Sequence, residues 1–333
     1  MFNYIDSTYN YSVNILITGG AGFIGSHLCE RLIKDGHDVT TVDNFSTGRA
    51  SNLDNLKGTG NFTLVEASIL DTAVLKPLVD RTDYVFHLAA AVGVFNIVNN
   101  PLASLLTNIR GTENVLEAAL ETRTPVFLTS SSEVYGKNIS DSLKESDDRI
   151  LGSPVTLRWS YSEAKAIDES LAYAYFVEKQ LETRIVRFFN TVGPRQLGAY
   201  GMVVPRFVKA ALANKPVTIY GDGNQTRCFA HVFDVVDAVI AIAFASNTIG
   251  QVINIGNDFE ISINDLARKI IDETGSKSEI VYVPYKEAYG DGFEDMERRV
   301  PNIDLINHLV GWKPKRDLST MISDISVEMK KGS

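Results

Sequence analysis

The sequence predicts an α/β fold, in which a doubly wound parallel sheet is joined to a smaller, interleaved α+β lobe. Short apolar segments alternate with longer amphipathic helical patterns over residues 13–188. Such uniformly apolar strands are typical of a parallel sheet that helices cover on both faces. Beyond residue 188 the chain becomes richer in glycine, proline and polar residues. We therefore expect an N-terminal extension over 1–12, a sheet domain over 13–188, and a second lobe over 189–330 interleaved with the last strands.

The individual elements follow from local pattern. The run Val13–Thr18 is apolar and β-branched, and a helical pattern extends from Gly22 to Asp35. Further elements are expected in the order of the chain, with strands at Val39–Val42, Phe62–Val65, Tyr84–Leu88 and Pro125–Thr129, and helices at Leu102–Glu121, Tyr161–Gln180, Pro205–Ala213, Asp234–Ala245 and Ile263–Thr274. The glycines in Tyr220–Asn224 predict a tight turn.

Composition excludes several classes of function. The 333 residues carry 32 Lys+Arg against 41 Asp+Glu, a net charge of -9, and binding to a phosphate backbone needs the opposite bias. No stretch reaches the roughly 18 apolar residues of a membrane span, and the start has no basic or apolar leader. The two cysteines and five histidines show no metal-ligand spacing. We expect a cytoplasmic protein with no metal, nucleic-acid or membrane partner.

A glycine motif predicts the cofactor. Gly19, Gly22 and Gly25 directly follow the first strand and open the first helix. This placement provides a tight turn, close backbone approach and free N–H groups for a pyrophosphate. Asp43 ends the second strand, where a carboxylate binds ribose hydroxyls and repels the 2′-phosphate of NADP. The pattern predicts a Rossmann-type domain that binds NAD.

A tyrosine and a lysine four residues apart predict acid–base chemistry. Tyr161 and Lys165 lie at the start of a predicted helix, where positions i and i+4 share a face. An ammonium near a phenol favours phenolate and lowers the phenol pKa. Tyr161 would then take a proton from a substrate hydroxyl while NAD+ is reduced.

These motifs resemble the extended branch of the short-chain dehydrogenase/reductase superfamily, the NAD-dependent sugar-nucleotide epimerases and dehydratases. The resemblance rests on Gly-x-x-Gly-x-x-Gly and on Tyr161-Ser-Glu-Ala-Lys165, and it extends from Val13 to about Ser319. It implies a catalytic role for Ser131, beside Tyr161 and Lys165, whereas Ser130 is better explained as a cap of its strand.

The resemblance also implies binding residues. Those expected at the cofactor, besides Tyr161 and Lys165, are Gly19, Gly22, Phe23, Ile24, Gly25, Asp43, Asn44, Ser68, Ile69, Leu88, Ala89, Ala90 and Asn108. Those expected at the substrate are Asn190, Arg195, Val204, Tyr220, Arg227, Tyr289 and Arg299. Asn190 and Arg227 match positions that hold the diphosphate of a nucleotide sugar, and Ser68 stands where an Asp normally contacts adenine.

The carboxylate of Glu133 narrows the set of reactions that the resemblance implies. A carboxylate at this position is similar to UDP-glucuronate decarboxylases, UDP-apiose/xylose synthases and nucleotide-sugar 4,6-dehydratases, whereas plain UDP-hexose 4-epimerases usually have a small or hydroxylic residue. Ser132 replaces the Asp of dTDP-glucose dehydratases, although GDP-mannose dehydratases share the Ser-Glu pair. Arg158-Trp-Ser-Tyr161 and the segment around Arg299 also look like the decarboxylase group. Glu133 is expected as proton donor or acceptor, and an arginine as the partner of the substrate carboxylate.

The sequence thus predicts an NAD+-dependent enzyme that decarboxylates UDP-glucuronate through a 4-keto intermediate. The alternatives are C4 epimerisation of UDP-glucose/galactose or of UDP-glucuronate/galacturonate, a 4,6-dehydratase, and a non-catalytic NAD sensor. The resemblance further implies a homodimer, in which Leu102–Glu121 and Tyr161–Gln180 form a four-helix bundle with their symmetry mates.

Overall fold

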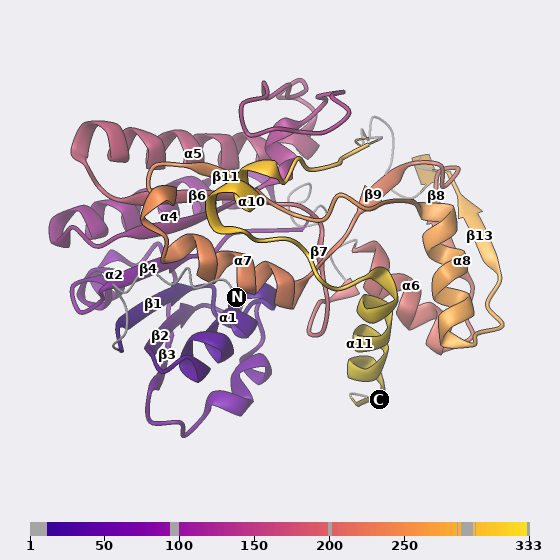
Figure 1. Cartoon of the computed structure of the whole chain (residues 1–333), viewed down its shortest axis with the longest axis horizontal. Coiled ribbons are helices and arrows are strands. Elements are labelled where there is room, and N and C mark those ends of the chain that lie inside the picture. Colours follow the sequence, from indigo (N-terminus) through magenta and orange to yellow (C-terminus); the bar gives the residue numbers. More distant parts are fainter. Residues whose placement is uncertain are drawn as a thin grey trace.

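The chain folds around one seven-stranded parallel sheet (Figure 1). The computed structural model describes residues 12–93, 100–198, 202–284, 286–287, 296 and 298–331. The sheet strands, from one edge to the other, are β11 (Val252–Ile255), β6 (Thr183–Phe188), β5 (Val126–Ser131), β4 (Tyr84–His87), β1 (Asn14–Thr18), β2 (Asp38–Asp43) and β3 (Phe62–Glu66). This order confirms the predicted α/β class, and β11 shows that a late segment completes the sheet.

The strand order reverses beside β1. The chain runs outward from β1 through β2 to β3, then returns to place β4 on the other side of β1. Thr18 and His87, the last residues of β1 and β4, are paired in register. Ligands of open α/β sheets bind beyond the carboxyl ends of the strands at such a reversal. The topology therefore positions a site where β1 and β4 end.

Helices cover both faces of the sheet. One face carries α2 (Thr72–Val79), α4 (Pro101–Thr122) and α5 (Ser160–Lys179), and the other carries α1 (Phe23–Lys34), α7 (Val232–Ala243) and α10 (Asp304–Val310). Burial on both faces explains why the strands are apolar without alternation. Short 3₁₀ helices are η2 (Ala50–Leu56), η3 (Ser132–Tyr135), η4 (Leu157–Trp159) and η6 (Ser246–Thr248).

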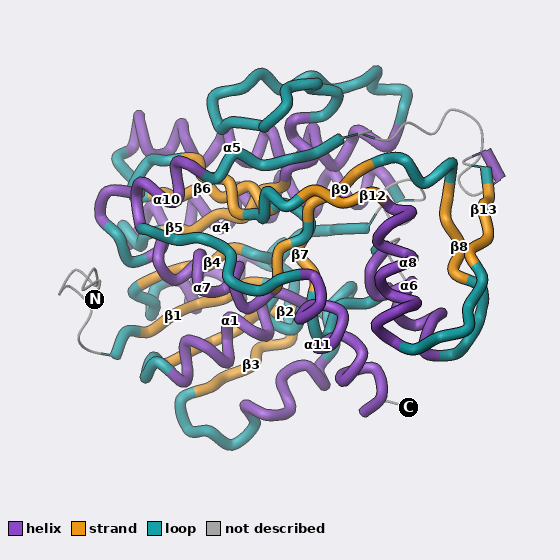
Figure 2. Tube along the Cα trace, turned by 45° about the vertical axis from the view of Figure 1, so that its right-hand side comes forward, coloured by secondary structure: helices purple, strands orange, loops and turns teal. Residues whose placement is uncertain are grey.

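A second apolar cluster lies to one side of the sheet, at the right in Figure 1. It is built mainly by α6 (Val203–Leu212), α8 (Ile263–Thr274) and α11 (Leu318–Lys331). Three two-stranded pairs accompany it, namely β8 (Val217–Tyr220) with β13 (Ile280–Val283), β9 (Thr226–Cys228) with β12 (Glu260–Ser262), and β7 (Thr191–Val192) with β10 (Ala230–His231). Figure 2 shows α6 and α8 beside the β8–β13 pair at the same edge of the molecule. This packing supports the predicted lobe.

Most expected elements lie within two residues of their predicted bounds. The helix predicted over Tyr161–Gln180 is α5, and the one over Leu102–Glu121 is α4. The predicted turn contains Gly221 and Gly223 with φ of 77° and 76°, a left-handed conformation that favours glycine. The helical pattern expected between the strands at Phe62–Val65 and Tyr84–Leu88 is α2, whereas we did not expect α10 or α11. Residues 1–11 of the predicted extension lie outside the described residues.

Among the residues that the structure describes, none of the helices is both long and apolar enough to span a membrane. Nor do His, Cys, Asp or Glu side chains gather there in threes in a way that would hold a metal ion.

Candidate active site

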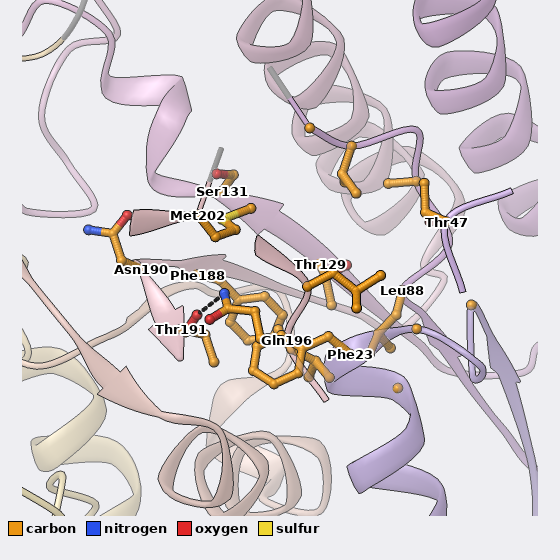
Figure 3. A pocket seen from close by; sticks show the side chains of 18 of the residues that line it. Phe23, Thr47, Leu88, Thr129, Ser131, Phe188, Asn190, Thr191, Gln196 and Met202 are labelled. Atoms are coloured by element: carbon orange, nitrogen blue, oxygen red, sulfur yellow. Dashed lines mark hydrogen bonds between the residues drawn. The ribbon is translucent and has the colours of Figure 1, made fainter. Parts of the chain in front are cut away.

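A cavity of about 510 Å³ opens beyond the carboxyl ends of β1, β4, β5 and β6. Its walls come from both parts of the fold, because α6 and β8 of the second lobe face the glycine turn of the sheet domain. In Figure 3, Thr47 and Leu88 lie toward one end of this cavity, and Ser131 and Asn190 lie toward the other. The dashed line there is the hydrogen bond that Gln196 Nε2 donates to the Thr191 carbonyl, 2.8 Å.

The glycine turn leaves no room for side chains. Gly19 has φ +76°, and a Cβ on it would lie 2.7 Å from the Ala89 backbone nitrogen. A Cβ on Gly25 would lie 2.3 Å from the Gly19 carbonyl oxygen. Both neighbours are backbone, so no side-chain movement relieves the clash. The turn is a cradle that only glycine can form, which fits the close approach of a pyrophosphate.

Asp43 stands at the end of β2 beside this cradle. Its carboxylate accepts hydrogen bonds from the Ala21 and Phe45 backbone N–H groups, at 2.9 and 2.8 Å. Burial raises the pKa of Asp43, and the two backbone donors oppose the rise. The side chain lines the cavity, as a partner of ribose hydroxyls would.

The structure brings together nearly all residues expected at the cofactor. Those that line the cavity are Gly19, Gly22, Phe23, Ile24, Gly25, Asp43, Asn44, Ser68, Ile69, Leu88, Ala89, Ala90, Tyr161 and Lys165. Asn108 is not among them. It is buried in α4, where its side-chain oxygen accepts from Ala91 N at 2.7 Å and its amide donates to Ala91 O at 3.3 Å. Asn108 therefore holds the segment after β4 in place without lining the cavity itself.

Ser131 and Tyr161 meet at the cavity wall. Ser131 is the last residue of β5 and its Oγ caps η3 by accepting from Glu133 N, 3.3 Å. Tyr161 lies in the first turn of α5. Burial and then the charges of Glu133 and Asp168 raise the pKa of Tyr161, while a hydrogen bond with the Ser131 side chain lowers it. The two hydroxyls are thus placed to bind the same substrate oxygen.

A buried ion pair fixes α5 against the strands. Arg187 of β6 donates to both Glu169 oxygens of α5, at 2.9 and 2.8 Å. Ser130 of β5 donates to Glu169 Oε1 at 2.6 Å. Three elements are joined through one carboxylate, so the distance between Ser131 and Tyr161 is set by rigid parts of the fold. Ser130 has this buried supporting role, in line with the expectation that it is not the catalytic serine.

Lys165 differs from the expectation in its partner. We expected its ammonium to lower the pKa of Tyr161, but the ammonium pairs with the Asp168 carboxylate at 3.1 Å. Both side chains are buried, with 2% and 0% exposed. Burial, and not the pairing of Lys165, is the main reason that the pKa of Tyr161 is raised. Lys165 still lines the cavity, whereas Asp168 lies behind it.

Glu133 lies between two arginines. Arg158 Nη1 is 2.5 Å from Glu133 Oε2, and Arg299 Nη1 is 2.9 Å from Glu133 Oε1. Burial favours a higher pKa, but the charges of Arg299 and Arg158 outweigh it and lower the pKa of Glu133 to about 2. Glu133 is therefore ionised at neutral pH, which argues against its expected use as a proton donor. The cluster carries one net positive charge.

The residues expected at the substrate line the other end of the cavity. Asn190, Arg195, Val204, Tyr220, Arg227 and Arg299 all face it. Arg195 is paired with Glu30 at 2.5 Å, and Arg227 Nη1 donates to the Thr226 carbonyl at 2.7 Å. Tyr289, the remaining expected residue, lies outside the described residues.

Sequence reasoning gave no role to two cavity arginines. Arg158 was quoted only as part of a motif, because nothing local predicts that η4 turns it toward Glu133. Arg206 lies at the start of α6 with its guanidinium 4.1 Å from the Tyr220 ring centroid. Its position directly after Val204 and Pro205, at the start of a helix that faces the cavity, was the available signal.

Comparisons with known proteins agree with this geometry. The profile described as "NAD dependent epimerase/dehydratase family" matches residues 15–256. A UDP-N-acetyl-alpha-D-glucosaminuronate decarboxylase of Bacillus cytotoxicus is 44% identical over 300 residues, 90% of this chain and 92% of that protein. UDP-glucuronic acid decarboxylase 1 of Xenopus tropicalis is 38% identical and is matched over 90% of this chain and 68% of its own length.

The fold is shared with solved structures of this kind. UDP-glucuronic acid 4-epimerase from Bacillus cereus, solved in complex with UDP-glucuronic acid and NAD, superposes with a TM-score of 0.87 at 29% identity. The match covers 96% of this chain and 100% of that one.

Proposed function

The chain belongs to the NAD-dependent epimerase/dehydratase family, and on this premise we propose that it decarboxylates a UDP-linked hexuronate, with UDP-glucuronate as the first candidate, through a transient 4-keto sugar. The enzyme is then a lyase whose NAD+ is restored within each turnover. NAD+, when bound in the glycine cradle, supplies the oxidation of C4 and its later reduction.

One observation carries this proposal. The cluster of Arg158, Glu133 and Arg299 adjoins Ser131 in the cavity wall and has an excess of one positive charge. A hexuronate brings a carboxylate to a site where a neutral hexose brings a hydroxymethyl group. Guanidinium groups bind carboxylates with fork geometry, and burial strengthens this contact. The cluster fits an acidic sugar better than a neutral one.

The hydroxyl pair suits the chemistry of the first half-reaction. The positive nicotinamide ring of bound NAD+ would counter the raised pKa of Tyr161 and favour its phenolate. Tyr161 would then take the proton of the C4 hydroxyl, and Ser131 would hold the same oxygen. Once C4 is a ketone, the C5 carboxylate is that of a β-keto acid. When the C5–C6 bond breaks and CO2 leaves, its electrons move to the C4 oxygen, where both hydroxyls can stabilise the negative charge of the enolate. The enolate then takes a proton at C5 from water, which restores the C4 ketone before it is reduced.

Glu133 serves this step as an anion. With a pKa of about 2 it keeps its charge at neutral pH and is a weak base, so its part is to orient Arg158 and Arg299. We propose this orienting role in place of the expected one as proton donor or acceptor.

Product analysis tests the proposal. Purified protein with NAD+ is incubated with UDP-glucuronate and, in parallel, with UDP-N-acetylglucosaminuronate, and products are followed by mass spectrometry and proton NMR. The N-acetylated sugar is included because the Bacillus cytotoxicus relative is named for it. Loss of one CO2 from either sugar is the expected result. Tyr161→Phe, which keeps the ring and removes the hydroxyl, should lower the rate by about 10²–10⁴-fold.

Two other outcomes would replace the proposal. An unchanged mass with inverted C4 would make the protein an epimerase, the activity named for the Bacillus cereus structural neighbour. No turnover of any UDP-sugar, together with tight NAD binding, would favour the non-catalytic sensor.

We also propose a cytoplasmic homodimer. The helices α4 and α5 pack against each other, and Tyr173 and Val177 of α5 are one turn apart and 51% and 57% exposed. Such an apolar pair on the exposed side of a helix suits a four-helix bundle with a second copy. The buried free thiols of Cys29 and Cys228 suit a reducing compartment. Analytical sedimentation of the wild-type protein and of the Val177→Asp variant measures what fraction of each forms the dimer.

A further inference from the structure

We propose that Asp168 is a positioning residue of the reaction, whose carboxylate anchors the Lys165 ammonium at the floor of the cavity. The inference rests on the proposed function only for the role of Tyr161, and its main test requires no sugar. Lys165 faces the cavity and Asp168 does not, so Asp168 acts through the lysine.

Lys165 and Asp168 form a buried ion pair. Lys165 Nζ donates to Asp168 Oδ2 at 3.1 Å, and the two side chains are 2% and 0% exposed. Asp168 Oδ1 is buried without a hydrogen-bond partner among the described residues. Burying a carboxylate costs free energy unless an opposite charge compensates it, and buried titratable groups of this kind concentrate at functional sites. The ammonium is the cation that compensates it.

A buried chain of polar groups supports the carboxylate from the sheet. Thr18 Oγ1 lies 2.7 Å from His87 Nδ1, and His87 Nε2 lies 3.1 Å from Thr112 Oγ1. Burial raises the pKa of Asp168, and the Lys165 ammonium and then a hydrogen bond from the Thr112 hydroxyl oppose this rise. Thr18 Oγ1 also accepts from Ala89 N at 3.1 Å. The carboxylate that holds Lys165 is thus connected to the ends of β1 and β4, where the glycine cradle begins.

The charge of Asp168 reaches Tyr161 as well. It is one of the two anions that raise the pKa of Tyr161, the other being Glu133 of η3. His87 of β4 is the titratable group that faces Lys165 from the sheet; burial and then the lysine charge lower its pKa to about 3. Glu133, with a pKa of about 2, and His87 therefore keep one charge state between pH 5 and 9. A change in the acidic limb of the pH profile then reports on Tyr161 and Asp168, the two groups beside Lys165 whose pKa values burial raises.

The experiment compares Asp168→Asn with Asp234→Asn, using the full-length protein. Both variants remove a buried carboxylate from a helix, but Asp234 of α7 pairs with Arg316 and does not line the cavity. We expect Asp168→Asn to weaken NAD+ binding about 10-fold by calorimetry and to move the acidic limb of kcat/KM to lower pH by about 0.5–1 unit. Asp168→Glu, which keeps the charge, should restore both. Asp234→Asn should lower Tm without moving the limb.

Several results would overturn the inference. An NAD+ affinity of Asp168→Asn that is unchanged or higher than that of wild type does so, as does an equal loss of NAD+ affinity in Asp234→Asn. If Asp168→Asn fails to fold, Asp168→Ser takes its place, since the smaller side chain leaves room for water. If wild-type protein turns over no UDP-sugar, the proposed function fails, while NAD+ affinity alone still decides the role of Asp168.

Discussion

Arg299 and Glu133, 166 positions apart in the chain, form a buried ion pair of 2.9 Å at the wall of the cavity. Arg158 completes the contact from the other carboxylate oxygen. Burial alone would raise the pKa of Glu133, so the two guanidinium groups are what keep this carboxylate ionised. The ion pairs therefore link the charge state of the site to its stability.

The first prediction concerns the pH dependence of stability. The pKa of Glu133 is lowered from 4.5 to about 2 in the folded state. Its contribution to the free energy of unfolding is then fully present above about pH 4.5 and is lost as the pH falls toward 2, and its size is on the order of 3 kcal/mol. Urea unfolding of wild type and Glu133→Gln should show a stability difference that shrinks between pH 5 and pH 3.

Glu121→Gln provides the control, because Glu121 forms an exposed ion pair with Lys76. Such pairs contribute little, so this variant should differ from wild type by less than about 1 kcal/mol at every pH. A stability difference for Glu133→Gln that stays constant down to pH 3 would show that its carboxyl is not held ionised.

The second prediction separates cofactor binding from stability. Gly25→Ala places a methyl group 2.3 Å from the Gly19 carbonyl oxygen, so the cradle must open and lose contact with the pyrophosphate. We expect NAD+ affinity to fall at least about 10-fold by calorimetry. Gly275→Ala is the matched control, since Gly275 ends α8 with φ +64° in open space. That variant should lose about 1 kcal/mol of stability and keep its NAD+ affinity. Equal NAD+ affinities of Gly25→Ala and Gly275→Ala would show that the glycine cradle is not part of the cofactor site.

The sequence predicted those parts of the site that depend on local spacing. Gly19, Gly25 and Asp43 lie within one strand–helix–strand unit, and Tyr161 and Lys165 lie on one helix turn. Their joint position follows once the secondary structure is right, because the carboxyl ends of parallel strands meet at one edge.

The spacing of residues along the sequence could not predict the charge states within the site. Lys165 has Asp168 as its partner three residues on, and the sequence alone does not decide between this carboxylate and Tyr161. Glu133 owes its ionised state to Arg158 and Arg299, which come from η4 and from the segment before α10. Such contacts depend on tertiary packing and burial, and these set pKa values.

The last prediction tests the diphosphate end of the cavity. Arg227 of β9 is 9% exposed and lines the cavity, where its planar fork can bind two phosphate oxygens at once. Arg227→Lys keeps the charge and loses the fork. UDP affinity should fall about 10-fold while uridine affinity stays unchanged, because uridine has no phosphate. Arg268→Lys, on the exposed side of α8, should change neither value. If uridine and UDP lose affinity equally, Arg227 supports the shape of the nucleoside pocket, and the diphosphate must be held by Arg195, Arg206 or both.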